Sequence, residues 1–150
     1  MGWSPHITVA CVVERQGRYL FVEETINGGL VLNQPSGHWE EGETLIAGAA
    51  REVLEETGWD VRPVALLGVY EYKPPDLDYG FLRFAFIAEP LRRHPERRLD
   101  DGIARALWLT PEELHAQHQR HRSPMVMRAV EDARAGRRFP LDLLAHLSMT

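Results

Sequence analysis

Three glutamates lie close together in the stretch AAREVLEETGW, residues 49–59. If this stretch is helical, Glu52, Glu55 and Glu56 are three or four residues apart, and like charges at that spacing repel by about 0.2–0.5 kcal/mol per pair. Glu55 and Glu56 also precede Gly58, a natural helix stop, so they lie at the negative end of the helix dipole, where carboxylates are disfavoured. This arrangement is poor for an empty helix and good for one that holds a divalent cation, because Mg²⁺ takes oxygen ligands.

The segment 44–57 is expected to form the helix that positions these acids. At 100° per residue its apolar side chains fill one face, and the three glutamates fall within an arc of about 100° beside that face. Gly48 lies in the same arc one turn upstream. It costs about 1 kcal/mol relative to alanine and leaves a bare patch that a bulky group could approach. Two interpretations remain open at this point: an amphipathic surface helix with solvated acids, or a cation site.

The rest of the chain alternates between strand-like and helix-like segments separated by short turns. Gly and Asn mark turns at 14–17 and 26–29, and Ser123 and Gly136 have the character of the N-cap and the stop of a last helix. This pattern indicates an α/β or α+β sandwich. The expected strands are 6–13, 18–24, 30–34, 64–72, 81–89 and 106–110, and the expected further helices are 111–118 and 123–136.

Composition narrows the function classes. The 150 residues are expected to form one domain, 1–150, and the net charge of −5 argues against broad nucleic-acid binding. The sequence has no apolar run of about 18 residues and no signal-peptide pattern, which argues against a membrane partner. The lone Cys11 stands in a strand-like run and is expected in the core; a single cysteine forms no internal disulfide, so a cytoplasmic setting is expected.

The stretch GHWEEGETLIAGAAREVLEETGW, from Gly37 to Trp59, resembles the signature of the Nudix hydrolases. Trp59 fills the last position of the pattern as a bulky apolar residue rather than an aliphatic one. The resemblance implies an α/β/α sandwich with a mixed central sheet, and attack by water on a diphosphate linked to another group. The positions that match the signature are Gly37, Glu43, Arg51, Glu52, Val53, Glu55, Glu56 and Gly58.

Stretches outside the signature extend the resemblance over about residues 6–144. PHITVACVV, FVEETING, FLRFAF and the region from RSPMV to PLDLL are similar to the NudJ-type phosphatases of bacteria. This similarity implies hydrolysis of nucleoside tri- and diphosphates and of hydroxymethylpyrimidine pyrophosphate. It implies a small phosphorylated substrate as the partner, and a monomer or a homodimer.

The family resemblance also implies roles for single residues. Glu52, Glu55, Glu56 and the main-chain carbonyl of Gly37 would hold Mg²⁺, with Mn²⁺ as the alternative ion. Glu52 and Glu56 would serve in catalysis together with Arg51. Arg51 would form an ion pair with Glu43 that aims the carboxylates, as groups behind metal ligands do.

The general base is left open between a helix glutamate and an acid from a later loop. In the family, the loop acid often stands six residues before the tryptophan of an element that here reads WLTPEEL, and that position is Gly102. Asp100 and Asp101 stand just upstream. Either Asp101 takes the role through a shift of the loop, or Glu52 alone is the base.

Arg83 interrupts the apolar segment FLRFAF, so it is expected to be paired or to face the ligand cleft, in contact with a phosphate or a base. The aromatic residues Trp39, Tyr72, Phe81 and Phe84 are candidates for stacking or for core packing. Two other functions remain: a different Nudix activity, such as cleavage of ADP-ribose or nucleotide sugars, and a Nudix-fold binding module without catalysis. The intact set of glutamates argues against the second.

Overall fold

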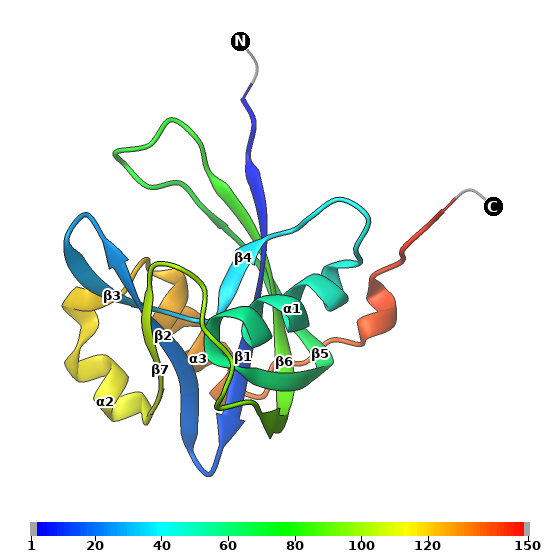
Figure 1. The fold of residues 1–150 in the computed structure, drawn as a ribbon. Coiled ribbons are helices and arrows are strands. Elements are labelled where there is room, and N and C mark those ends of the chain that lie inside the picture. Colours follow the sequence, from blue (N-terminus) through cyan, green and yellow to red (C-terminus); the bar gives the residue numbers. More distant parts are fainter. Residues whose placement is uncertain (1–2, 149–150) are drawn as a thin grey trace.

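The strands of this chain form one mixed sheet, with a helix against each face (Figure 1). The structure is a computed structural model and describes residues 3–148. Its strands are β1 His6–Arg15, β2 Arg18–Ile26, β3 Gly29–Asn33, β4 Ser36–His38, β5 Trp59–Tyr72, β6 Phe81–Arg93 and β7 Ile103–Leu109. Its helices are α1 Leu45–Thr57, α2 Pro111–Ala116 and α3 Met125–Arg134, with 3₁₀ turns η1 His118–Arg120 and η2 Leu141–Leu143.

Strand β1 is the branch point of the sheet, whose order is β3-β2-β1-β6-β5, with β4 added beside β1 and β7 beside β2. β1 runs parallel to β6 over residues 6–13 and antiparallel to the other strands it meets. It pairs with β4 at residues 8–10 but with β2 only at residues 14 and 15. The two halves of the sheet therefore join at one end of β1 and separate at the other.

Alternation along the central strands divides the core into two layers. On β1, Val9 and Val13 pack in the same buried cluster as Val53 of α1, whereas Val12 packs with Val126 of α3. Figure 1 shows α1 and α3 on the opposite faces that this alternation requires. The expected α/β/α sandwich with a mixed sheet is confirmed, and Cys11 is buried in the α1-side core.

The strand bounds differ from the expected ones in several places. β5 begins at Trp59 rather than at 64 and continues through Pro63, where the pairing with β6 shifts register. β7 begins at Ile103 rather than at 106, and the short strand β4 was not expected. Each of these segments is fixed by pairing with a strand distant in sequence. The local sequence pattern therefore does not predict where the strand begins.

Trp59, the bulky residue at the end of the signature, packs between distant parts of the chain. Its ring lies edge-on to that of Trp108, with 5.6 Å between the centroids, and the Arg15 guanidinium lies 5.1 Å and 4.8 Å from the two rings. Such cation–π contacts are attractive. The aromatic side chain at this position therefore joins the start of β5 to β7 and to the end of β1.

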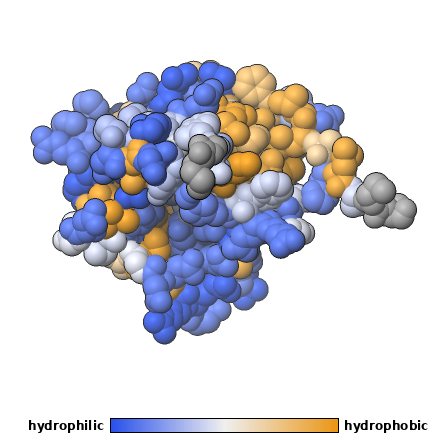
Figure 2. All heavy atoms as spheres, turned by 90° about the horizontal axis from the view of Figure 1, so that it is seen from above, coloured by the Kyte–Doolittle hydropathy of each residue, from blue (hydrophilic) through white to orange (hydrophobic). Residues whose placement is uncertain are grey.

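The outer surface of the protein combines hydrophilic and apolar regions. The face in Figure 2 is mostly hydrophilic, with apolar side chains gathered on one side of it. Among residues 3–148, no helix is both long and apolar enough to cross a membrane.

Candidate active site

Helix α1 is held at both ends by local contacts. The Thr44 side chain accepts a hydrogen bond from the Ala47 N–H at 3.0 Å, and Gly58, with φ of 77°, ends the helix and donates its N–H to Leu54 O. Ala49 and Val53 are fully buried on the sheet side. Because these contacts fix the rotation of α1, Glu52 and Glu56 are buried beside β4 and Glu55 lies further out.

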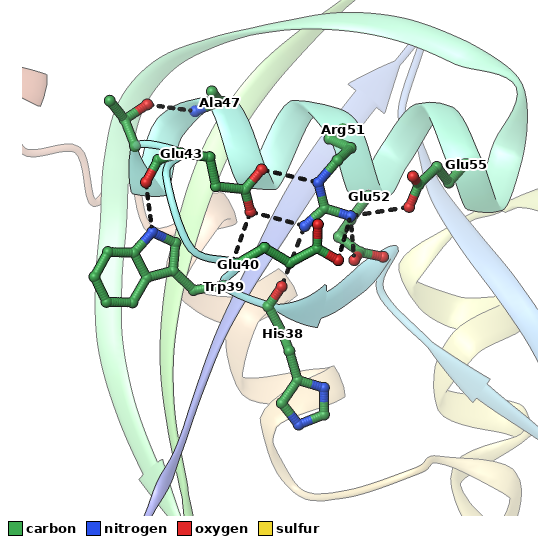
Figure 3. A network of polar contacts seen from close by, with 9 residues as sticks. His38, Trp39, Glu40, Glu43, Ala47, Arg51, Glu52 and Glu55 are labelled. Atoms are coloured by element: carbon green, nitrogen blue, oxygen red, sulfur yellow. Dashed lines mark hydrogen bonds and ion pairs between the residues drawn. The ribbon is translucent and has the colours of Figure 1, made fainter.

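Arg51 stands at the centre of the carboxylates (Figure 3). It donates two hydrogen bonds to Glu43, at 2.9 and 2.8 Å, so the expected ion pair is present. Its Nη1 also donates to Glu52 at 2.8 Å and to Glu55 at 2.9 Å. The hydrogen bonds and charge of Glu43 and Glu52 raise the pKa of Arg51, and those of Arg51 lower the pKa of Glu43. The repulsion among the acids is therefore offset in part by one guanidinium.

Two glycines make room for carboxylates. A β-carbon on Gly37 would lie 2.2 Å from Cδ of Glu52, and one on Gly48 would lie 2.6 Å from Oε1 of Glu43. The bare patch at Gly48 is thus filled by Glu43 of the same chain, which replaces the expected approach of an external bulky group. Both glycines serve the same acidic centre.

Glu52 and Glu56 lie in a poorly solvated environment. Burial raises the pKa of Glu52 to about 7 and that of Glu56 to about 9, and neighbouring acids add to both shifts. Desolvation disfavours the charged form of a carboxylate, and a cation would favour it. Buried oxygen donors of this kind fit a hard divalent cation such as Mg²⁺.

Asp100, and not Asp101, joins the helix acids. Carboxylate oxygens of Glu52, Glu55 and Asp100 lie within 4.8 Å of one another. The Asp101 side chain is 95% exposed and lies 3.4 Å from Arg98, at the rim of the site. Gly102 has φ of 89°, a conformation that favours glycine, so the position at which the family often has an acid is the turn residue of this loop. The sequence shows two adjacent acids in LDDG, but which of them lies next to the helix acids depends on where this turn falls.

A cleft of about 830 Å³ opens beside the acids, between the separated halves of the sheet. Glu52, Glu56 and Gly37 line one end of it. Arg83 also lines it, as expected for a ligand-facing residue, and its Nη2 donates to Ser36 Oγ at 3.3 Å. Burial lowers the pKa of Arg83 to about 10.

The four aromatic candidates divide into two groups. Tyr72 and Phe81 line the cleft. Phe84 packs against the α1-side core, and Trp39 donates its indole N–H to the carbonyl of Glu43 at 2.8 Å. Of the four, only Tyr72 and Phe81 are therefore placed to contact a ligand in the cleft.

Comparisons with known proteins agree with this geometry. The profile of the NUDIX domain matches residues 4–129. Phosphatase NudJ of Escherichia coli is 41% identical over 142 residues, which cover 95% of this chain and 92% of that protein. A NUDIX hydrolase from Nitrosomonas europaea has a TM-score of 0.94 and 43% identity, covering 96% of this chain and 98% of the other.

A more distant structure shares the fold alone. The NUDIX domain of Shewanella oneidensis NrtR, in complex with ADP ribose, has a TM-score of 0.69 at 16% identity and covers 89% of this chain and 88% of its own. The profile match, the close relatives and the acidic centre on α1 lead to one conclusion: this chain belongs to the Nudix hydrolase family and is an enzyme that acts on diphosphate bonds.

Proposed function

We propose that this enzyme is a Mg²⁺-dependent phosphatase that hydrolyses nucleoside tri- and diphosphates and hydroxymethylpyrimidine pyrophosphate. The observation that carries the proposal is the acidic centre: clustered oxygens of Glu52, Glu55 and Asp100, with Glu56 buried beside them at one end of a large cleft. The choice of substrates rests on similarity to phosphatase NudJ along 95% of the chain.

The residues that would hold Mg²⁺, or Mn²⁺ in its place, are Glu52, Glu55, Glu56 and the carbonyl of Gly37. When bound, the ion neutralises phosphate oxygens and acidifies a bound water. Little covalent chemistry falls to the protein in such a reaction, so positioning dominates. Arg51 positions Glu52 and Glu55 through its paired hydrogen bonds, and Glu43 positions Arg51.

We assign the proton acceptor to the acidic centre rather than to the loop rim. Glu52 is buried at the end of the cleft, beside Glu55 and Asp100, where its carboxylate can accept a proton from a water held there. Asp100 is the loop acid that shares the centre with it, whereas Asp101 points into solvent. In this proposal Asp100 takes the role that the sequence alone suggested for Asp101.

A substrate panel in millimolar Mg²⁺ tests the proposal. Nucleoside triphosphates, nucleoside diphosphates, hydroxymethylpyrimidine pyrophosphate, ADP-ribose and a nucleotide sugar are compared, and orthophosphate and pyrophosphate are scored separately. We expect turnover of the first three with orthophosphate among the products. Cleavage of only ADP-ribose or nucleotide sugars would replace this proposal with the other Nudix activity, and no turnover on any compound would favour a binding module.

A further inference from the structure

The floor of the cleft holds three buried polar atoms that have no protein partner among residues 3–148. They are Thr8 Oγ1, Asn33 Oδ1 and Arg83 Nε, on side chains only 5–7% exposed. All three residues line the cleft, whereas the only other such atom in that range, Gln34 Oε1, belongs to a residue outside the lining. An unpaired buried polar group costs about 1–3 kcal/mol, so three in one place call for a common explanation.

The three side chains come from β1, β3 and β6. Thr8 of β1 and Arg83 of β6 are directly paired in the parallel ladder. Ser36 Oγ of β4 accepts a hydrogen bond from Arg83 Nη2 at 3.3 Å and one from Asn33 Nδ2 at 3.4 Å. Arg83 and Asn33 therefore meet at Ser36, and Thr8 lies beside Arg83. Ser36 joins this group to the acidic centre, because its N–H donates a hydrogen bond to Glu56.

The polarity of the group is defined. Arg83 can only donate. Asn33 Nδ2 lies 3.5 Å from the Glu24 carboxylate, which can only accept, so the amide orientation is fixed and Oδ1 is the free acceptor. The Thr8 hydroxyl can donate or accept. The three atoms are covered in this structure, so their side chains would have to turn toward the cleft to offer a ligand one fixed donor, one fixed acceptor and one adaptable group.

This combination fits a heterocycle better than another phosphate. A phosphate would suit Arg83, but its oxygens would face the acceptor of Asn33. A planar ring with an N–H donor next to an acceptor satisfies both residues. Tyr72, Phe81, Leu77 and Met125 add apolar and aromatic surface to the lining of the same cleft. We propose that Thr8, Asn33 and Arg83 form the subsite that recognises the edge of a nitrogen heterocycle in the substrate.

The subsite rests on the proposed function for its place in catalysis, but its test needs no turnover. Calorimetry in Mg²⁺ measures the Kd of two non-hydrolysable probes, α,β-methylene cytidine diphosphate and methylenediphosphonate, which has no base. The variants are Thr8→Val, which removes the hydroxyl and keeps the shape, and Arg83→Met. Thr110→Val is the matched control, because its hydroxyl caps α2 and its residue does not line the cleft.

We expect Thr8→Val to weaken the cytidine probe about 2- to 12-fold, and Arg83→Met to weaken it about 10- to 100-fold. Binding of methylenediphosphonate should be unchanged in both. Thr8→Val should also keep or raise Tm, since it removes an unpaired buried hydroxyl, whereas Thr110→Val should lower Tm and leave both Kd values unchanged. Equal weakening of the two probes by Arg83→Met would mean that Arg83 holds a phosphate. That result, or an unchanged cytidine Kd in both cleft variants, would overturn the subsite.

The experiments can reject the heterocycle subsite and the proposed function independently of each other. Wild-type protein that binds the cytidine probe at least tenfold more tightly than the base-free probe, with that preference lost in the variants, supports the subsite even if the substrate panel shows no turnover. Turnover of nucleotides with no such preference would leave the proposed function standing and remove the subsite.

Discussion

The main-chain N–H of Ser36 donates a hydrogen bond to the Glu56 carboxylate, with 3.0 Å between the nitrogen and Oε1. This bond ties β4 to the buried side of α1 and places a carboxylate at the cleft floor. The amide oxygen of glutamine can accept the same bond, whereas its nitrogen cannot serve as an anionic ligand. Replacing Glu56 with glutamine therefore separates its role in catalysis from its role in holding β4 against α1.

Glu56→Gln and Glu52→Gln are each expected to lower kcat at least about 10²-fold, because both side chains are assigned to the metal or to the proton of the water. The fold should persist, and in EDTA Tm should not fall, since each change removes a poorly solvated acid. Steady-state rates and circular dichroism on the two variants check this. Glu41→Gln, at an exposed acid outside the cleft lining, is the control; near-normal rates in either site variant would remove the metal-site assignment.

Asp100→Asn should lower kcat more than Asp101→Asn. Both residues are exposed, but Asp100 shares the acidic centre with Glu52 and Glu55, whereas Asp101 lies against Arg98. We expect a loss of about tenfold or more for the first variant and less than about twofold for the second, measured at saturating substrate. Each serves as the control for the other, since the two changes are identical and adjacent. A larger loss at Asp101 would return the role to that residue.

Arg51→Met should destabilise the metal-free protein by about 1–3 kcal/mol, because it leaves Glu43, Glu52 and Glu55 without their shared donor. In millimolar Mg²⁺ the loss should shrink, since the ion supplies positive charge to the same acids. Urea unfolding in EDTA and in Mg²⁺ measures both values. Arg62→Met breaks a single exposed pair with Glu89 and should cost under about 0.5 kcal/mol in either buffer. An equal loss for Arg51→Met in the two buffers would show that Arg51 acts independently of a cation.

The ion pairs of Glu23 predict that the protein loses stability in acid. It is buried, and hydrogen bonds, first from Arg105 at 2.6 Å and then from Arg120, lower its pKa. Its folded pKa is therefore below the unfolded value of about 4.3, so its contribution to stability is complete above that pH and is lost as the pH falls through the folded pKa.

Urea midpoints from pH 7 to pH 3 check this expectation. Glu23→Gln should be less stable than the wild type at pH 7, and the difference should narrow below about pH 4.3. Glu71→Gln, at an exposed acid of β5, should follow the wild-type curve. A difference that stays constant with pH would mean that the ionisation of Glu23 contributes nothing.

The parts of this molecule that follow from local sequence were predictable. α1 was expected at 44–57 and is found at Leu45–Thr57, because its cap, its apolar face and its stop lie within one segment. The expected N-cap at Ser123 is off by one residue: α3 begins at Met125 with Pro124 as its N-cap, and the Ser123 hydroxyl accepts from the Met125 N–H at 3.1 Å. The two core layers follow from strand alternation in the same way.

Features assembled from distant residues were not predictable. The spacing of the three helix acids suggested unrelieved repulsion, but Arg51 donates hydrogen bonds to two of them, Glu52 and Glu55. Thr8, Asn33 and Arg83 come together through the pairing of β1 with β4 and β6 and through the hydrogen bonds of Asn33 and Arg83 to Ser36. No periodicity in the sequence records either arrangement.

The loop that carries Asp100 is held by main-chain bonds. The Asp100 N–H donates to the Glu55 carbonyl at 3.0 Å, and the Gly102 carbonyl accepts from the Thr25 N–H at 2.8 Å. These bonds involve no side chain, so outside the glycine turn at Gly102 they hold the loop whichever side chains it carries. Which residue of this loop directs its carboxylate to α1 therefore depends on where the turn falls, and in this chain that residue is Asp100. Homologues are better compared here by the position of the carboxylate than by counting residues back from the tryptophan.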